Sequence, residues 1–99
     1  MPIAVATSVE GVSIRLTEER WEHIIKGHVV LRGRQAQVLE AIERPDQVFA
    51  GEESELLAVR KKDGLYLIVV YREVDTQDGF VVTAYLTRRP ARRPVVWKS

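Results

Sequence analysis

The alternation and helical spacing of apolar residues predict a strand and then a helix in the first part of the chain. Residues 12–16 alternate apolar and polar side chains after a turn signal at Glu10–Gly11, as a half-buried strand does. Thr17 is the expected N-cap of a first helix. Apolar positions then recur every three or four residues up to Gly27, which is the expected C-cap.

The pattern beyond Gly27 predicts one more helix and a β-meander. The helix covers Gln35–Glu43, and Pro45 ends it. Asp63–Gly64 is the strongest hairpin signal in the chain. Four strands are expected, at residues 47–51, 55–61, 65–74 and 80–87. The predicted fold class is therefore α+β, with an N-terminal strand and two helices packed on one face of a three- to four-stranded antiparallel sheet. Residues 1–89 are expected to form one domain, followed by a basic C-terminal tail at residues 90–99.

The turns predict which strand residues share a face, because side chains alternate with period two. A two-residue Asp63–Gly64 loop pairs Arg60 with Leu67, and a five-residue loop between the next two strands pairs Tyr71 with Thr83. One face is then almost wholly apolar and is expected under the helices; it carries Leu57, Val59, Tyr66, Ile68, Val70, Phe80, Val82, Ala84 and Leu86. The opposite face has no predicted element to cover it; it carries Arg60, Lys62, Tyr71, Thr83, Tyr85 and Thr87.

This uncovered face has two interpretations. Arginine together with threonine and tyrosine hydroxyls is suited to binding an anion such as phosphate. Threonine and tyrosine are also good strand formers, and a sheet with one solvated face ordinarily carries them. The pattern alone does not separate the two.

Composition narrows the classes of function. With 99 residues, of which 45% are hydrophobic and 29% charged, the chain is expected to form one soluble globular domain. No apolar run reaches the roughly 18 residues of a membrane span, and the first residues do not show the pattern of a signal peptide. There is no cysteine, which excludes disulfides, thiol catalysis and thiolate zinc sites. These features fit a cytoplasmic protein that does not contact a membrane.

Charge is distributed unevenly along the chain. Residues 88–99 hold five basic residues and no acid. The rest of the chain therefore contains ten basic and 14 acidic residues. A basic tail on a mildly acidic body suits a polyanionic partner. A solvated, unstructured terminus has the same composition.

Both histidines lie in the stretch "RWEHIIKGH", residues 20–28. On one continuous helix His23 and His28 would lie about 140° apart, so they would not share a face. A zinc-binding helix uses i,i+4 spacing and needs further ligands, so neither a metal site nor a cofactor is predicted. A left-handed Gly27 would free His28 to turn toward a sheet edge or the uncovered face. Each imidazole is either a proton-transfer group or an ordinary surface residue.

Three stretches, taken in order, resemble a known group of nucleases. "LTEERWEHIIKGH", then "IERPDQVF", then "YLIVVYREV" and "GFVVTAYLT" are similar to the phage-associated members of the barnase–EndoU–colicin–RelE-like nuclease superfamily, which share the BECR fold. The resemblance runs from about residue 14 to residue 89. It implies a helical N-terminal part followed by a four-stranded antiparallel sheet. The better-known members of these families are metal-independent ribonucleases, many of them toxins.

The resemblance implies that the ribose 2′-hydroxyl attacks the adjacent phosphate of RNA. This reaction needs an acid, a base and a cation for the charge that develops on the phosphate. Carried over by motif, His23 and His28 become the acid and base, with Arg60 and Thr87 completing the catalytic set. The expected substrate-binding residues are Tyr71, Thr83, Tyr85, Arg88 and Arg89.

RNA and a protein antitoxin, or another protein partner, are the expected partners. Two other classes of function stay open beside the ribonuclease. One is a non-catalytic protein-binding module that uses the uncovered sheet face or a sheet edge, which the acidic body and the aliphatic residues near Tyr71 and Tyr85 favour. The other is nucleic-acid binding through the arginine tail without cleavage.

Overall fold

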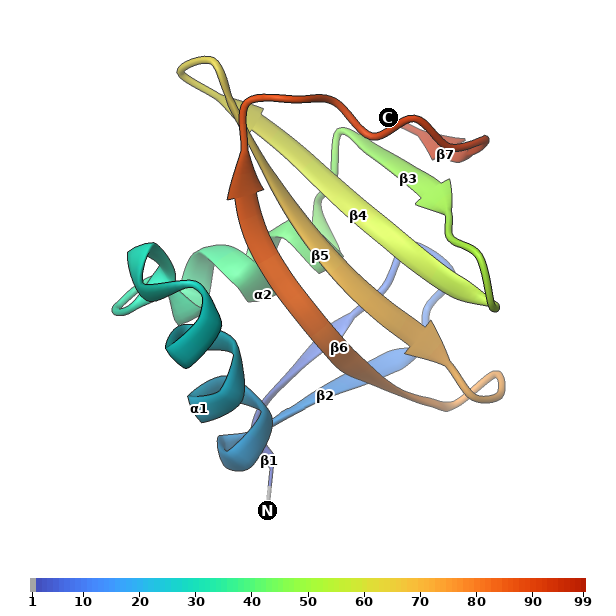
Figure 1. Cartoon of the computed structure of the whole chain (residues 1–99). Helices are drawn as coiled ribbons and strands as arrows, with labels where there is room; N and C mark the ends of the chain where they lie inside the picture. The colour runs from blue at the N-terminus through green and yellow to red at the C-terminus, as the bar shows by residue number, and fades with distance from the viewer. Residues whose placement is uncertain (1) are drawn as a thin grey trace.

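One mixed sheet of seven strands organises the residues that this computed structural model describes, 2–99, with side chains described from residue 4 (Figure 1). The strand order is β1-β2-β6-β5-β4-β3-β7. In chain order the elements are β1 (Pro2–Thr7), β2 (Ser13–Thr17), α1 (Glu18–Gly27), the 3₁₀ helix η1 (Val29–Leu31), α2 (Gln35–Glu43), β3 (Gln47–Ala50), β4 (Glu55–Lys62), β5 (Leu65–Glu73), β6 (Asp78–Thr87) and β7 (Val95–Lys98).

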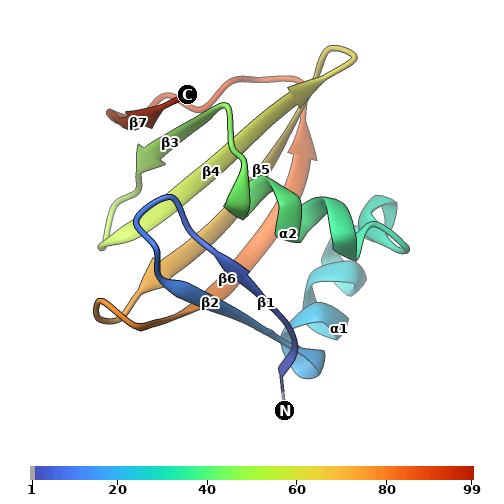
Figure 2. The same ribbon diagram turned by 180° about the vertical axis from the view of Figure 1, so that it is seen from behind.

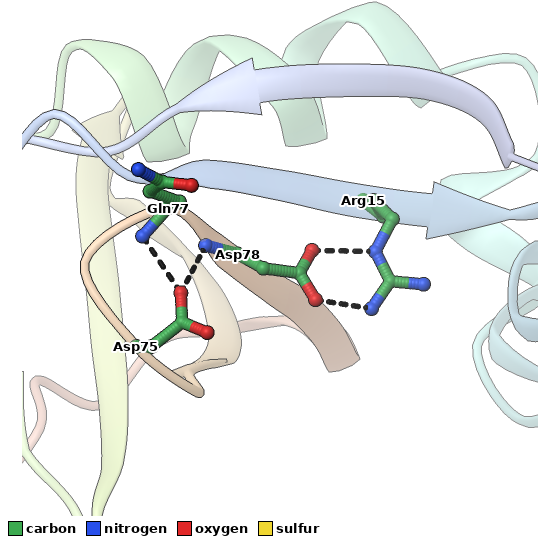
Figure 3. Close-up of polar contacts among 4 residues, drawn as sticks. All are labelled: Arg15, Asp75, Gln77 and Asp78. Carbon is green, nitrogen blue, oxygen red and sulfur yellow. Dashed lines mark hydrogen bonds and ion pairs between the residues drawn. The ribbon is translucent and has the colours of Figure 1, made fainter.

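This sheet corrects the predicted fold class. The prediction placed two helices and a strand on a three- to four-stranded antiparallel sheet, but β1, β2, β3 and β7 all join the central β4–β6 meander, and β2 runs parallel to β6. Arg15 on β2 makes a bidentate ion pair with Asp78 on β6, at 2.8 and 2.9 Å (Figure 3). These two residues are 63 positions apart in the chain. The alternation of apolar and polar residues in a strand indicates which of its faces is buried. It does not indicate which strand lies beside it, so it could not predict the pairing of β2 with β6.

The two helices begin and end close to the predicted positions. The Thr17 hydroxyl accepts a hydrogen bond from the backbone N–H of Arg20 at 3.1 Å, which confirms the N-cap. The prediction that Gly27 is a left-handed C-cap is wrong. Gly27 is the last helical residue and its φ is not positive, whereas His28, with φ −136° and ψ 73°, leaves the helix. α2 covers Gln35–Glu43 as predicted.

The main core lies between the helices and one face of β4, β5 and β6. α2 packs on β1, β4 and β5, and α1 packs on β2 and β6. Figure 2 shows α2 and the β1–β2 hairpin on the same side of the meander. The side chains fully buried there include Ile14, Leu16, Ile24, Leu31, Val38, Ile42, Val69 and Tyr71. No helix among residues 2–99 has both the length and the apolar character needed to cross a membrane.

The other face of the meander, called the outer face here, is not covered by a helix in the part of the chain described (Figure 1). It carries a second apolar cluster of Phe49, Val59, Ile68 and Val70, surrounded by Leu57, Tyr66, Val82, Tyr85 and Ala91. After β6 the chain crosses one end of this face, and β7 then pairs with β3. Arg93 in this connection forms an ion pair with Glu52 at 2.6 Å. Part of the basic tail is therefore an edge strand of the sheet.

The register between β5 and β6 differs from the predicted one. Asp75 closes a tighter turn than the five-residue loop, because its Oδ1 accepts hydrogen bonds from the backbone N–H groups of Gln77 and Asp78 at 2.7 and 2.9 Å (Figure 3). Next to this turn Tyr71 pairs with Val81, two residues from the predicted partner Thr83. A β-bulge between Tyr71 and Val70 then shifts the register by one residue, so that Val70 pairs with Thr83 and the net displacement is one.

This shift reverses the predicted faces of β4 and β5 relative to β6. The Asp63–Gly64 hairpin itself has the predicted register, with Arg60 opposite Leu67. Because the pairing with β6 is displaced by one residue, Arg60 and Tyr71 lie on the helix side instead of the uncovered face. The predicted apolar face under the helices is wrong for the same reason: its β4 and β5 members, Leu57, Val59, Tyr66, Ile68 and Val70, lie on the outer face.

Candidate functional site

The candidate site lies at the free edge of β6, where His28 meets Tyr85. β2 pairs with β6 only over Asp78–Phe80, so among residues 2–99 no strand lies beside the later part of β6 on that side, and α1 and η1 pack there instead. His28 joins these two helices: its backbone N–H donates to the carbonyl of Ile24 at 2.8 Å, and its own carbonyl accepts from Leu31 at 3.0 Å. The main chain thus fixes the imidazole beside the edge of the sheet.

The His28 imidazole packs on the Tyr85 ring. The two ring centroids are 5.9 Å apart, and the ring planes make an angle of 36°. Both side chains are half-buried. Tyr85 pairs with Ile68 of the outer-face cluster, so this contact brings the histidine to the face that carries the predicted hydroxyl groups. His28 was expected to turn toward a sheet edge or the uncovered face if Gly27 were left-handed; it lies beside Tyr85 at the edge of β6 although Gly27 is not left-handed.

Next to this pair, Lys61, Tyr66 and Thr87 form one cross-strand row on the outer face. Lys61 pairs with Tyr66 and Tyr66 pairs with Thr87, and the Lys61 ammonium lies 5.6 Å from the centroid of the Tyr66 ring. The Thr87 hydroxyl accepts a hydrogen bond from the backbone N–H of Arg89 at 3.1 Å. Its own O–H remains free to donate to a bound anion.

The remaining predicted residues divide between the two sides of the sheet. Thr83 lies on the outer face opposite Val70, and Arg88 and Arg89 are exposed just beyond β6. On the helix side, Arg60 is 3.5 Å from Glu40 of α2 in a partly exposed ion pair. Tyr71 is fully buried in the main core.

Tyr71 therefore cannot bind a substrate in this fold. Burial raises the pKa of its phenol, and the charges of Glu73 and Glu10 raise it further. Its hydroxyl has no hydrogen-bond partner among the described side chains and backbone. The predicted role of Tyr71 as a substrate-binding residue is wrong, because the register shift turns it into the core.

His23 lies apart from the His28–Tyr85 pair. It is exposed on α1 and lines a shallow depression with Thr17, Glu19 and Arg20, which neither His28 nor Tyr85 lines. On a continuous helix the five-residue spacing already places the two histidines on different faces. In addition, His23 lies within α1 whereas His28 lies just after its end.

Sequence reasoning missed Lys61 and Tyr66 as site residues. The predicted hairpin already paired these two residues, but their face was placed under the helices. Small residues carried the missing signal: Ala58 and Ala84 are both fully buried on the helix side. A small alanine side chain leaves room for a helix, so Ala58 indicates the helix side of β4. Because side chains alternate along a strand, Val59 and Lys61 then lie on the outer side.

The arrangement suits chemistry on a phosphodiester. An imidazole exchanges protons near neutral pH, an ammonium group stabilises developing negative charge, and hydroxyl groups hydrogen-bond phosphate oxygens. Among the described residues, no group of three or more His, Asp or Glu side chains is placed to hold a metal ion. No protein-family model, curated protein or solved structure matches the chain.

Proposed function

We propose that this chain is a small metal-independent endoribonuclease, toxin-like, whose active site lies on the outer face at the edge of β6. The observation that carries the proposal is the packing of His28 on Tyr85, at 5.9 Å between ring centroids. This contact supports one site that contains both a proton-transfer group and the hydroxyl groups of β6. The catalytic role of His28 comes from the nuclease resemblance of its motif, and a cytoplasmic RNA is the expected substrate.

In the proposed reaction the 2′-hydroxyl of a ribose attacks the adjacent phosphate. His28 takes the proton of this hydroxyl, and the P–O bond to the 5′ oxygen of the next nucleotide breaks as that oxygen takes a proton from solvent water and leaves as a hydroxyl. Lys61 takes the place first assigned to Arg60 and stabilises the charge on the phosphate. Thr83, Tyr85 and Thr87 supply hydrogen bonds to its oxygens, while Arg88 and Arg89 attract the RNA backbone. The product carries a 2′,3′-cyclic phosphate.

The two histidines provide a matched test. Purified protein should cut a labelled RNA in the presence of EDTA and leave 2′,3′-cyclic ends. His28→Ala should lower the cleavage rate by about 10²–10⁴-fold, the range for loss of a general acid or base. His23→Ala should leave the rate within about twofold, because His23 is exposed on α1 away from Tyr85. Equal activity of both variants would contradict the assignment, provided that circular dichroism shows both to be folded.

Lys61 and Arg60 provide a second matched pair, because they are adjacent on β4 and point to opposite faces. Lys61→Ala should lower the rate about ten- to a hundredfold, whereas Arg60→Ala should not. If Arg60→Ala is the damaging change, the phosphate lies on the helix side and the proposed face is wrong. Wild-type protein that binds RNA without cutting it would instead favour the non-catalytic binding module. Growth arrest on expression, relieved by the product of a neighbouring gene, would support a toxin with a protein antitoxin.

A further inference from the structure

A second concave region lies on the helix side of the sheet and reaches the outer-face row at Lys61. It is a cleft of about 550 Å³ between η1, the start of α2 and the β4–β5 hairpin. We call it the η1–hairpin cleft. Its apolar lining consists of Val30 and of Leu31, Leu65, Leu67 and Leu86. Among the described residues that line it there is no aromatic side chain.

The charged lining of the cleft is predominantly basic. Arg34, Arg60, Lys61 and Lys62 line it, against the two acids Glu40 and Asp63. Glu40 is already paired with Arg60 at 3.5 Å. Among the described side chains, Arg34 and Lys62 form no ion pair. These two exposed cations are therefore free to meet an acidic ligand.

Exposed apolar side chains lie in the lining of the cleft and next to it. Val30 on η1 and Leu65 at the hairpin, which line the cleft, are 56% and 36% exposed, and the adjacent Val29 is 64% exposed. Such side chains offer a ligand apolar contact area beside the basic groups. An extended chain with acidic and aliphatic side chains satisfies both the charge and the shape of this surface.

We propose that the η1–hairpin cleft binds an acidic peptide segment of a partner protein. Its carboxylates meet Arg34 and Lys62, and an aliphatic side chain rests on the leucines between them. A single-stranded nucleic acid fits less well, because such sites stack bases on aromatic side chains and the cleft has none. The two sites share Lys61 at the hairpin end of the cleft, but the peptide contacts proposed at Arg34 and Lys62 do not depend on catalysis on the outer face.

The site can be probed by fluorescence anisotropy with a short labelled peptide in which leucines are set among glutamates. Arg34→Glu and Lys62→Glu should each weaken its binding by about tenfold or more. Lys26→Glu is the matched control: it reverses an exposed cation on α1 that does not line the cleft, and affinity should stay within about twofold. Amide NMR shifts in unmodified protein should change at Leu31, Leu67 and Leu86. Because these NMR shifts are measured on unmodified protein, they test peptide binding in the cleft even if a variant fails to fold.

Several results would overturn the proposal. No binding of the peptide, or shifts that map elsewhere, would remove the site. Equal binding of a peptide with serines in place of leucines would show that the apolar floor takes no part. An equal loss of affinity in Lys26→Glu would show general charge attraction only. An unlabelled oligouridylate that displaces the peptide and shifts the same three amides would assign the cleft to nucleic acid instead. Loss of RNA cleavage in His28→Ala bears on the outer face alone, so the two proposals fail separately.

Discussion

Replacing Gly79 by alanine is expected to destabilise the sheet at the point where three strands meet. Gly79 pairs with Ile14 of β2 on one side and with Glu73 of β5 on the other. A Cβ atom at this position would overlap the backbone carbonyl oxygen of Arg72 and lie 2.7 Å from Cδ1 of Ile14. A side-chain tip can rotate away, but a backbone carbonyl moves only with its strand. The substitution must therefore separate β5 from β6 locally.

The magnitude follows from the cost of overpacking. Extra methylenes in a packed interior cost about 1–3 kcal/mol, and the backbone contact places Gly79→Ala near the upper value, about 3 kcal/mol. For a domain of this size each kcal/mol shifts the melting temperature by about 4–8 °C, so a fall of about 12–24 °C is expected. Gly27→Ala is the matched control. No atom lies within 4 Å of a Cβ built there, and Gly27 ends α1 without a positive φ. This change should stabilise the protein by about 0.5 kcal/mol, because alanine favours the helix.

Thermal unfolding followed by circular dichroism measures both changes, with urea denaturation as a second readout. The comparison tests the β5–β6 pairing next to the Asp75 turn. In the five-residue loop first predicted, Gly79 would lie outside the strand and alanine would cost little. A Gly79→Ala protein that melts within a few degrees of wild type would refute the pairing of Gly79 with Glu73, and with it the register that leads into the β-bulge.

Two further predictions concern ionisation. Burial raises the pKa of the Tyr71 phenol most, and the charges of Glu73 and Glu10 raise it further. The free energy of unfolding should therefore be unaffected by this group below the ordinary tyrosine pKa of 10.0 and should fall as the pH rises above it. Tyr71→Phe should remove this loss of stability at alkaline pH. Because the buried hydroxyl lacks a hydrogen-bond partner among the described residues, the variant should also be more stable than wild type at neutral pH, by up to about 1 kcal/mol. If the unfolding free energy from urea titrations falls with alkaline pH in the variant as it does in wild type, the prediction is wrong. The hydrogen bond from Arg93 and its positive charge lower the pKa of Glu52 below the ordinary value of 4.5. The contact therefore stabilises the fold above pH 4.5, and this stabilisation is lost as the pH falls through the lowered pKa. Arg93→Ala should return the Glu52 pKa toward its ordinary value in carboxyl NMR titrations, and an unmoved titration would show that the ion pair does not form in solution.

Local signals in the sequence predicted elements well. Thr17 caps α1 because its hydroxyl satisfies an N–H three residues away. Asp63 and Gly64 adopt φ values of 53° and 78°, which the two-residue hairpin turn requires and which the Asp-Gly pair favours. Each of these features depends on residues within a few positions of one another. A single sequence contains the whole interaction in such cases.

The global arrangement depended on contacts that no short window contains. β7 joins β3 across almost half the chain, and β2 joins β6 in parallel through only three residue pairs. The turn at Asp75 was read from its length, whereas its hydrogen bonds to Gln77 and Asp78 set the register. That turn displaces the register by two residues, and the β-bulge between Tyr71 and Val70 makes the net displacement one, which exchanges the two faces of a strand.

The candidate site shows the consequence most clearly at β4. Arg60 and Lys61 are neighbours with the same charge, and the sequence analysis chose Arg60 as the phosphate-binding cation. The sheet gives them different partners: Arg60 pairs with Glu40 of α2, and the Lys61 ammonium lies over Tyr66 on the outer face. Composition could predict that this strand carries a cation, but only the register decides which one shares a face with Thr87.

The short pairing of β2 with β6 also determines where a histidine can act. β2 contacts β6 over three residues and is held there by the bidentate pair of Arg15 with Asp78. If β2 continued along β6, it would occupy the edge against which His28 packs. Because β2 diverges after this contact and α1 follows it directly, the end of the helix reaches the open part of the edge near Tyr85. The same few residues that make the sheet mixed instead of antiparallel thus create the opening through which the imidazole reaches the outer face.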